Sequence, residues 1–195
     1  ANTEKYRKRV MKKKLLFSFL TIWFLGTSYT IAHMHGLHLV SFSHEKLDSN
    51  IEINEISNDW GMIHVLAEGC GCSEIIADYL IERKSLKDVS ESIMLLGETK
   101  QYAVKLKEAG FKILSSKDIK GYVEGVPLLI IHNKIGDIMY SGGYANNMVN
   151  PITKIQDINL LKQVKNNINP KDYLVMGCAV AMNIKKELDP LGLKY

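Results

Sequence analysis

Two cysteines separated by a single glycine are the residues of this chain whose types and spacing best fit chemistry. Cys70 and Cys72 follow an apolar run that ends at Ala67, and they precede a helical pattern that starts at Ser73. A helix N-terminus carries partial positive charge and unpaired backbone N–H groups, and both stabilise an anion. A thiolate at such a position has a lowered pKa and is a competent nucleophile. The sequence therefore predicts thiol chemistry, with Cys70 as the nucleophile.

The short spacing of the pair limits what its disulfide can do. Cys70 and Cys72 can approach closely enough to bond, but the small ring leaves little freedom for the preferred dihedral angle. A strained disulfide is easily reduced, so such a pair suits oxidation or isomerisation better than stable reduction. The alternative is that these are inert buried cysteines, which are common in protein cores.

The third cysteine, Cys178, lies far along the chain between the apolar residues Met176 and Ala179. It is a candidate resolving thiol for a mixed disulfide on Cys70. Alternatively it joins Cys72 and staples the C-terminal tail, which would add roughly 4 kcal/mol of stability in the chain-entropy model, or it stays unpaired in the core. An odd number of cysteines favours redox or metal chemistry over a purely structural disulfide framework.

The net charge of +4 over 195 residues comes from one end of the chain. Residues 5–14 hold seven Lys and Arg, and the remaining residues carry slightly more acids than bases. This distribution gives no support for a nucleic-acid surface. The length allows one ordinary domain plus additional segments.

Residues 15–32 contain no charged side chain and directly follow the basic segment 1–14. Their length is at the lower edge for a membrane span. We interpret them as an uncleaved, single-pass anchor in the inner (cytoplasmic) membrane, with the basic segment in the cytoplasm and the rest of the chain in the periplasm. The alternative is a signal sequence that is cleaved near residues 30–32.

The rest of the chain divides into a polar spacer (33–58), one domain (59–169) and a C-terminal extension (170–195) that we expect to pack on the domain. Strands joined through helices should be parallel, and a closing hairpin antiparallel. The patterns therefore predict an α/β fold with a mixed central sheet and helices on both faces. The expected strands are 60–67, 92–96, 111–114, 127–131 and 138–144, and the expected helices are 73–83, 99–109 and 155–167.

Residues 67–77 read Ala-Glu-Gly-Cys-Gly-Cys-Ser-Glu-Ile-Ile-Ala and align without a gap with the active-site segment of thioredoxins. With the element order and a Val-Pro pair before a hairpin, the chain resembles the thioredoxin-like superfamily. The resemblance covers roughly residues 60–167. It implies a thioredoxin-like three-layer fold in which Cys70 is the attacking cysteine, Cys72 replaces the family's proline and Ser73 replaces its second cysteine.

The resemblance also implies a groove for an extended partner chain, lined by Val126, Pro127, Gly71 and Ser73, with a cis bond before Pro127. The anchor and spacer resemble membrane-tethered thioredoxins of the TlpA and ResA kind, and the CxC with the Gly-Cys-Ala-Val tail resembles the RedB-like group. The implied activity is a thiol–disulfide oxidoreductase acting on the thiols or disulfides of exported proteins, without a cofactor. Two features depart from the family: CxC replaces CxxC, and Gly69 replaces a tryptophan.

Two other functions fit the same residues. CxC with a nearby His or Met can hold Cu(I), as in a copper-binding assembly factor, and His33, His35, His38 and His44 can bind copper or zinc. The chain has no spacing typical of a structural zinc site. A redox-silent binding module is the second alternative. Gly142-Gly143 predicts a bulge or tight strand end rather than a phosphate loop, because no Lys-Ser/Thr follows.

Overall fold

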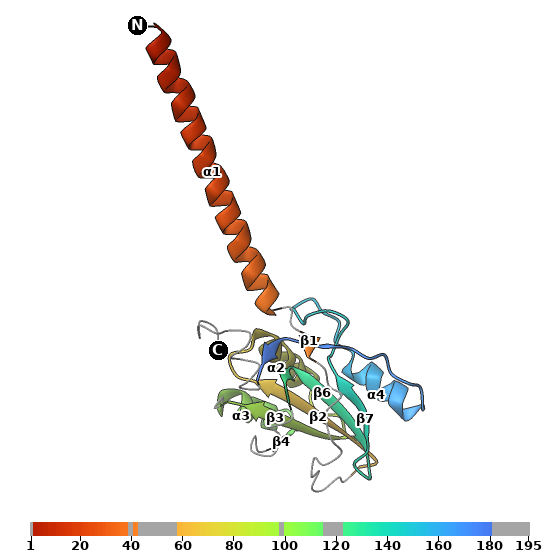
Figure 1. Cartoon of the computed structure of the whole chain (residues 1–195). Helices are drawn as coiled ribbons and strands as arrows, with labels where there is room; N and C mark the ends of the chain where they lie inside the picture. Colours follow the sequence, from red (N-terminus) through yellow and green to blue (C-terminus); the bar gives the residue numbers. More distant parts are fainter. Residues whose placement is uncertain (1, 39–40, 43–57, 98–99, 115–122, 181–195) are drawn as a thin grey trace. The chain divides into compact units, whose positions relative to one another are not determined.

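The computed structural model describes residues 2–38, 41–42, 58–97, 100–114 and 123–180 (Figure 1). Residues 43–57 of the predicted spacer, including His44, and residues 181–195 of the predicted extension lie outside these ranges. The chain forms two compact units, residues 1–38 and 39–195. The first is helix α1 (Asn2–His38), whose segment Met11–Ile31 is long and apolar enough to cross a membrane. This helix also contains residues 33–38, which the sequence pattern assigned to the spacer.

The second unit is built on a mixed five-stranded sheet in the order β4-β3-β2-β6-β7 (Figure 1). β2 and β3 are parallel, as are β3 and β4, whereas β6 is antiparallel to both β2 and β7. This is the mixed sheet that the pattern of buried runs predicted. In the order of the sheet, the strands are β4 (Lys112–Leu114), β3 (Ser90–Leu96), β2 (Trp60–Ala67), β6 (Leu128–Asn133) and β7 (Ile138–Gly142).

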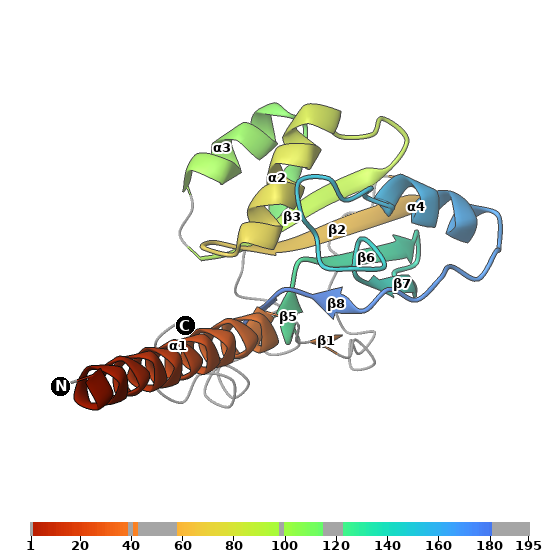
Figure 2. The ribbon, with the colours of Figure 1, turned by 90° about the horizontal axis from the view of Figure 1, so that it is seen from above.

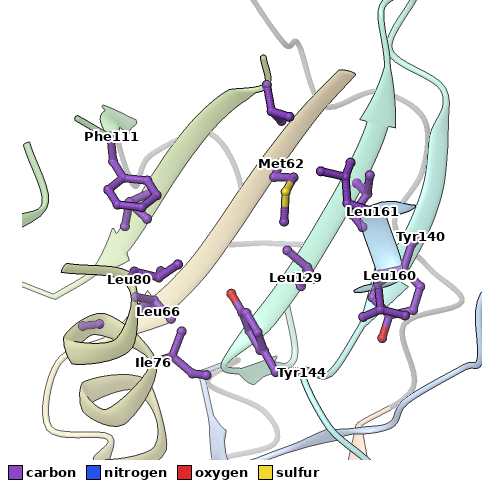
Figure 3. Packing of buried hydrophobic residues seen from close by; sticks show 14 of the residues in the cluster. Met62, Leu66, Ile76, Leu80, Phe111, Leu129, Tyr140, Tyr144, Leu160 and Leu161 are labelled. Carbon is purple, nitrogen blue, oxygen red and sulfur yellow. The ribbon is translucent and has the colours of Figure 1, made fainter. Parts of the chain in front are cut away.

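Three helices cover one face of this sheet: α2 (Gly71–Arg83), α3 (Lys100–Glu108) and α4 (Asp157–Lys165) (Figure 2). Their apolar side chains share one core with alternate residues of the strands, as Figure 3 shows. The labelled core residues in that view are Met62, Leu66, Ile76, Leu80, Phe111, Leu129, Tyr140, Tyr144, Leu160 and Leu161.

The expectation of helices on both faces is wrong for the described part of this unit. The reason is topological. The connections from β2 to β3 and from β3 to β4 both step in the same direction along the sheet. Right-handed crossovers that step the same way place their helices on the same side. α2 and α3 are therefore neighbours over one face, and the other face needs a different cover.

Short strands provide that cover. β5 (Gly125–Val126) pairs antiparallel with β9 (Cys178–Ala179), and β1 (Ser41–Phe42) pairs antiparallel with β8 (Val175–Met176). Their buried side chains join those on the second face of β2 and β6 in a separate core. The third layer of the fold is therefore made partly by the C-terminal segment. The buried members of this core are Ile63, Val65, Cys70, Met94, Leu96, Val123, Val126, Leu128, Ile130, Val175 and Ala179.

A buried polar network lies under the helices. The Glu91 carboxylate accepts hydrogen bonds from the Arg83 guanidinium at 2.7 and 3.2 Å, and from the backbone N–H of Leu86 at 2.6 Å. His64 Nε2 lies 3.4 Å from the same carboxylate, and His64 Nδ1 lies 2.8 Å from the Tyr144 hydroxyl. The network ties β2 and β3 to the last turn of α2.

Arg83 also faces a second carboxylate. Its Nε lies 3.3 Å from Asp157 Oδ2, although the two atoms are not aligned for a hydrogen bond, and the Tyr79 hydroxyl donates to Asp157 Oδ1 at 2.8 Å. One guanidinium thus lies between two buried acids. Removing one member of a buried ion pair is costly because it leaves an uncompensated charge.

Glu91 should therefore make the fold sensitive to acid. Burial would raise the pKa of its carboxyl, but the hydrogen bonds and charges of His64 and Arg83 outweigh burial and lower that pKa from 4.5 to about 2. A lowered folded-state pKa means that the carboxylate's stabilisation is complete above pH 4.5 and is lost as the pH falls toward 2. The contribution at neutral pH is about 3 kcal/mol.

We expect Glu91→Gln to lower the free energy of unfolding of the detergent-solubilised chain by about 3 kcal/mol at neutral pH. The difference from the wild type should shrink as the pH falls from 4.5 toward 2, because the wild type then loses the same charge. Denaturant unfolding across this pH range measures both effects. Glu82→Gln, at an exposed position of α2, is the matched control. A difference that stays constant with pH would contradict the assignment.

Candidate functional site

Cys70 occupies the N-cap position of α2. Its backbone is extended (φ −102°, ψ 106°), and its carbonyl accepts the first helical hydrogen bond from the Glu74 N–H at 3.0 Å. Its side chain makes no capping hydrogen bond. The residue is 1% exposed. The structure thus places this sulfur at the helix start, where the sequence pattern expected it, but buries it.

Ser73 positions the start of α2. Its hydroxyl accepts a hydrogen bond from the backbone N–H of Ala67 at 3.1 Å, which ties the first helical turn to the end of β2. Ser73 is buried in this structure, at 2% exposure. Gly71, between the two cysteines, is exposed, and a Cβ added there would meet open space.

The bond between Val126 and Pro127 is cis, as the resemblance led us to expect. Both residues are buried; Val126 ends β5, and Pro127 lies between β5 and β6. The Cys70 sulfur lies 3.9 Å from the Val126 carbonyl oxygen, so the protonated thiol donates a long hydrogen bond to it. The predicted nucleophile and the predicted proline loop are therefore adjacent.

Cys178 reaches the same place from the C-terminal segment. In the antiparallel pairing of β5 with β9, it lies directly opposite Val126. The residue before it, Gly177, is required by this approach, because a Cβ there would overlap the Val126 carbonyl oxygen. The spacing of the chain did not reveal this contact. A glycine directly before a cysteine in an apolar run was the available signal of close backbone approach.

Cys72 lies in the first turn of α2, two residues after Cys70. Its thiol donates to the carbonyl oxygen of Val149 at 3.5 Å, in the loop between β7 and α4. Nothing in the sequence pattern singled out Val149. All three cysteines are thiols in this structure, with no disulfide between them. The geometry leaves both Cys72 and Cys178 as neighbours of Cys70.

The surroundings of Cys70 favour its thiolate. Hydrogen bonds from the side chains of Cys178 and Cys72 hold the pKa of the Cys70 thiol far below its usual range, although burial opposes this. The hydroxyl and the backbone N–H of Ser73 act in the same direction. A thiolate is the nucleophilic form of cysteine. The arrangement can therefore attack a disulfide at neutral pH once a partner reaches the sulfur.

The described residues include no group of three or more His, Cys, Asp or Glu arranged to hold a metal ion. His33, His35 and His38 fall in the last turns of α1, but their side chains are not described. Gly142 ends β7, and the next residue, Gly143, donates its N–H to the Tyr173 carbonyl at 2.7 Å. This pair is thus a strand end against which the C-terminal segment lies.

Comparisons with known proteins support the fold. No family model matches the chain, and no curated protein is similar to it in sequence. A hypothetical protein from Sinorhizobium meliloti 1021 is similar in structure, with a TM-score of 0.51 and 10% identity over 63% of this chain and 79% of that one. A domain of a possible thiol-disulfide isomerase from Cytophaga hutchinsonii matches with a TM-score of 0.39 and 12% identity, over 59% and 81%. The mixed sheet, the order of its strands and the cis bond before Pro127 make this a thioredoxin-like fold.

Cys178 should control the acidity of Cys70. We expect Cys178→Ala to raise the pKa of Cys70 toward the usual value of about 8.5, because the largest contribution to its lowering is removed. The rate of iodoacetamide alkylation of Cys70 against pH, followed by mass spectrometry, gives the midpoint. Cys72→Ala should shift the midpoint less. The midpoint, and not the absolute rate, is the readout, since the substitution also changes access. An unchanged midpoint would contradict this role of Cys178.

Proposed function

We propose that this chain is a membrane-anchored, extracytoplasmic thiol–disulfide oxidoreductase in which Cys70 is the nucleophile. The observation that carries the proposal is the meeting of three thiols from distant parts of the sequence. Cys70 lies at the start of α2, beside Cys72 and opposite the cis Val126–Pro127 bond, and the Cys178 thiol hydrogen-bonds to it. A core cysteine with a packing role alone needs no such partners.

The reaction uses two of these thiols and needs no cofactor. The Cys70 thiolate attacks one sulfur of a substrate disulfide, so that a mixed disulfide forms and the other substrate sulfur leaves as a thiolate that takes up a proton. A second cysteine of the site then attacks the Cys70 sulfur and releases the second substrate thiol. The substrate gains two electrons, and the protein keeps an internal disulfide. An external dithiol reduces this internal disulfide back to two thiols. The same steps in the reverse direction oxidise a substrate dithiol.

The substrates are the thiols or disulfides of exported proteins. α1 supplies the membrane attachment, and its apolar segment follows seven Lys and Arg in residues 5–14. Basic residues beside a span stay on the cytoplasmic side, which sends residues 39–195 across the inner membrane. An oxidising compartment is also where disulfide chemistry is needed.

Replacing the nucleophile should abolish exchange. We expect Cys70→Ser to reduce disulfide exchange with a model peptide disulfide to the uncatalysed rate, because a serine hydroxyl does not form the attacking anion at neutral pH. Release of the peptide thiol measures the rate. Ser141→Ala is the control, since the Ser141 hydroxyl is buried in β7 without a hydrogen-bond partner among the described residues. Wild-type exchange in Cys70→Ser would refute the role of Cys70.

The anchor should stay on the mature protein. After expression of the full chain, we expect the product to retain residues 15–32 and to remain in the membrane fraction after a high-salt wash, because salt weakens only charge-mediated attachment. N-terminal sequencing and fractionation measure this. A soluble product that begins near residue 33 would show that α1 is a cleaved signal sequence.

A further inference from the structure

The C-terminal segment Tyr173–Val180, here called the strap, is held at three places. The Tyr173 carbonyl accepts a hydrogen bond from the Gly143 N–H at 2.7 Å, beyond the end of β7. β8 pairs with β1, and β9 pairs with β5 beside the cysteines. The strap therefore crosses the face of the sheet opposite α2, α3 and α4 (Figure 2).

The strap contributes to the buried cluster that holds Cys70. Cys70 is 1% exposed, and Val126 and Pro127 are buried, as are Gly177 and Ala179 of the strap. A disulfide on another protein must bring its sulfur into contact with the attacking sulfur, in line with the bond that breaks. In the closed conformation such a disulfide has no access to Cys70. The site has to open before it can act on a protein.

The strap also has the form of a bound peptide. It runs antiparallel to β5, with Cys178 opposite Val126 and Ala179 opposite Gly125. The N–H of Val180 donates to the Glu124 carbonyl at 2.8 Å, which extends the contact by one residue. Addition of an extended segment to a strand edge is a common mode of peptide recognition. Here the segment brings a thiol to Cys70.

The contact restricts which sequence fits. Because any Cβ at position 177 would overlap the Val126 carbonyl oxygen, the residue before the incoming cysteine must be glycine for the backbone to come this close. Ala179 is 1% exposed, so the residue after the cysteine also has little room. The backbone edge of β5 thus selects an extended segment that contains Gly-Cys followed by a small residue.

We propose that the strap is an internal occupant of the substrate site, which an extended Gly-Cys segment of an exchange partner must displace from the edge of β5. The redox part of this inference rests on the proposed function, whereas the closure of Cys70 by the strap does not. Cys70 forms a mixed disulfide with the disulfide-bonded cysteine of the displacing segment, and the sulfur to which that cysteine was bonded leaves as a thiol. The displacing segment then lifts off the edge of β5 while still joined to Cys70, the strap returns, and the Cys178 thiolate attacks the Cys70 sulfur. The partner leaves as a thiol, and the new Cys70–Cys178 disulfide locks the strap until an external dithiol reduces it.

The test compares strap variants of the full chain in detergent. Val180→Pro removes the N–H that bonds to Glu124, and Val180→Ala retains it as the matched control. Gly177→Ala is a second way to lift the strap, through overlap with Val126. The probe is a synthetic peptide of residues 173–180 whose cysteine carries a thionitrobenzoate group by a mixed disulfide. Attack by Cys70 on the peptide sulfur forms the protein–peptide disulfide and releases the coloured thiolate, and mass spectrometry identifies the modified cysteine.

We expect Val180→Pro and Gly177→Ala to react at Cys70 roughly 10-fold faster than the wild type and Val180→Ala, as loss of one or more backbone hydrogen bonds predicts. A peptide with valine in place of its glycine should react slowly with every variant. Amide hydrogen exchange should show loss of protection at Cys178, whose N–H faces β5, in the two strap variants, with the strands β2 and β3 still protected. That protection establishes that the variants remain folded.

The outcomes separate the two proposals. The inference would be overturned if the strap variants lost amide protection but reacted with the peptide no faster than the wild type. It would also be overturned if the glycine and valine peptides reacted at the same rate. Strap amides that stay protected in both variants would also overturn it, because these contacts would not hold the strap. If Cys70 reacts with no peptide in any form, the proposed function fails instead. Iodoacetamide alkylation of Cys70, which needs no redox activity, then still tests closure and should be faster in Val180→Pro.

Discussion

The site depends on the antiparallel main-chain pairing of Val126 with Cys178. This contact fixes which residue of the C-terminal segment lies opposite the proline loop. Side chains alternate between the two sides of a strand, so a slip of one residue would turn the Cys178 thiol away from Cys70 and direct Gly177 or Ala179 toward it. The register therefore decides whether the site contains two thiols or three. It also decides the acidity of Cys70, since the Cys178 thiol makes the largest contribution to lowering its pKa.

The start of α2 positions the Cys70 sulfur more than it stabilises the thiolate. The N-cap cysteine makes no capping hydrogen bond, and the fixed point is instead the hydroxyl of Ser73, which accepts from the backbone N–H of Ala67. The sequence pattern attributed the activation of the thiol to the positive end of the helix. The structure adds specific donors around the sulfur, from two thiols and from Ser73. A buried thiolate requires such donors because it has given up its hydration.

Sequence patterns predicted those features of the molecule that depend on residues close together in the chain. The junction of β2 with α2, the cis bond before Pro127 and the mixed sheet follow from short apolar runs, a Gly-rich turn and an aligned segment of the chain. The placement of the helices on one face could not be predicted from these patterns, because it depends on where β4 joins the sheet. The buried network was equally hidden. Glu91 stands in a strand beside serines, and nothing near it in the sequence identifies His64 or Arg83 as its partners. The pairing of the strap joins residues far apart in the chain, and Gly177 is the one local sequence signal of it.

Helix α2 is held at both of its ends, and this bears on how the site can open. Its first turn is tied to β2 through Ser73, and its last turn is tied to Glu91 and Asp157 through Arg83. Both attachments are buried, so moving the helix would break a hydrogen bond at one end and expose unpaired charges at the other. The strap has weaker attachments: short strand pairings of two residues each, a few backbone hydrogen bonds, and the buried side chains of Val175 and Ala179. Lifting it would break no buried ion pair among those described, so it should cost less free energy than moving α2. Access to Cys70 is therefore expected to come from the strap, while the helix keeps the nucleophile in place.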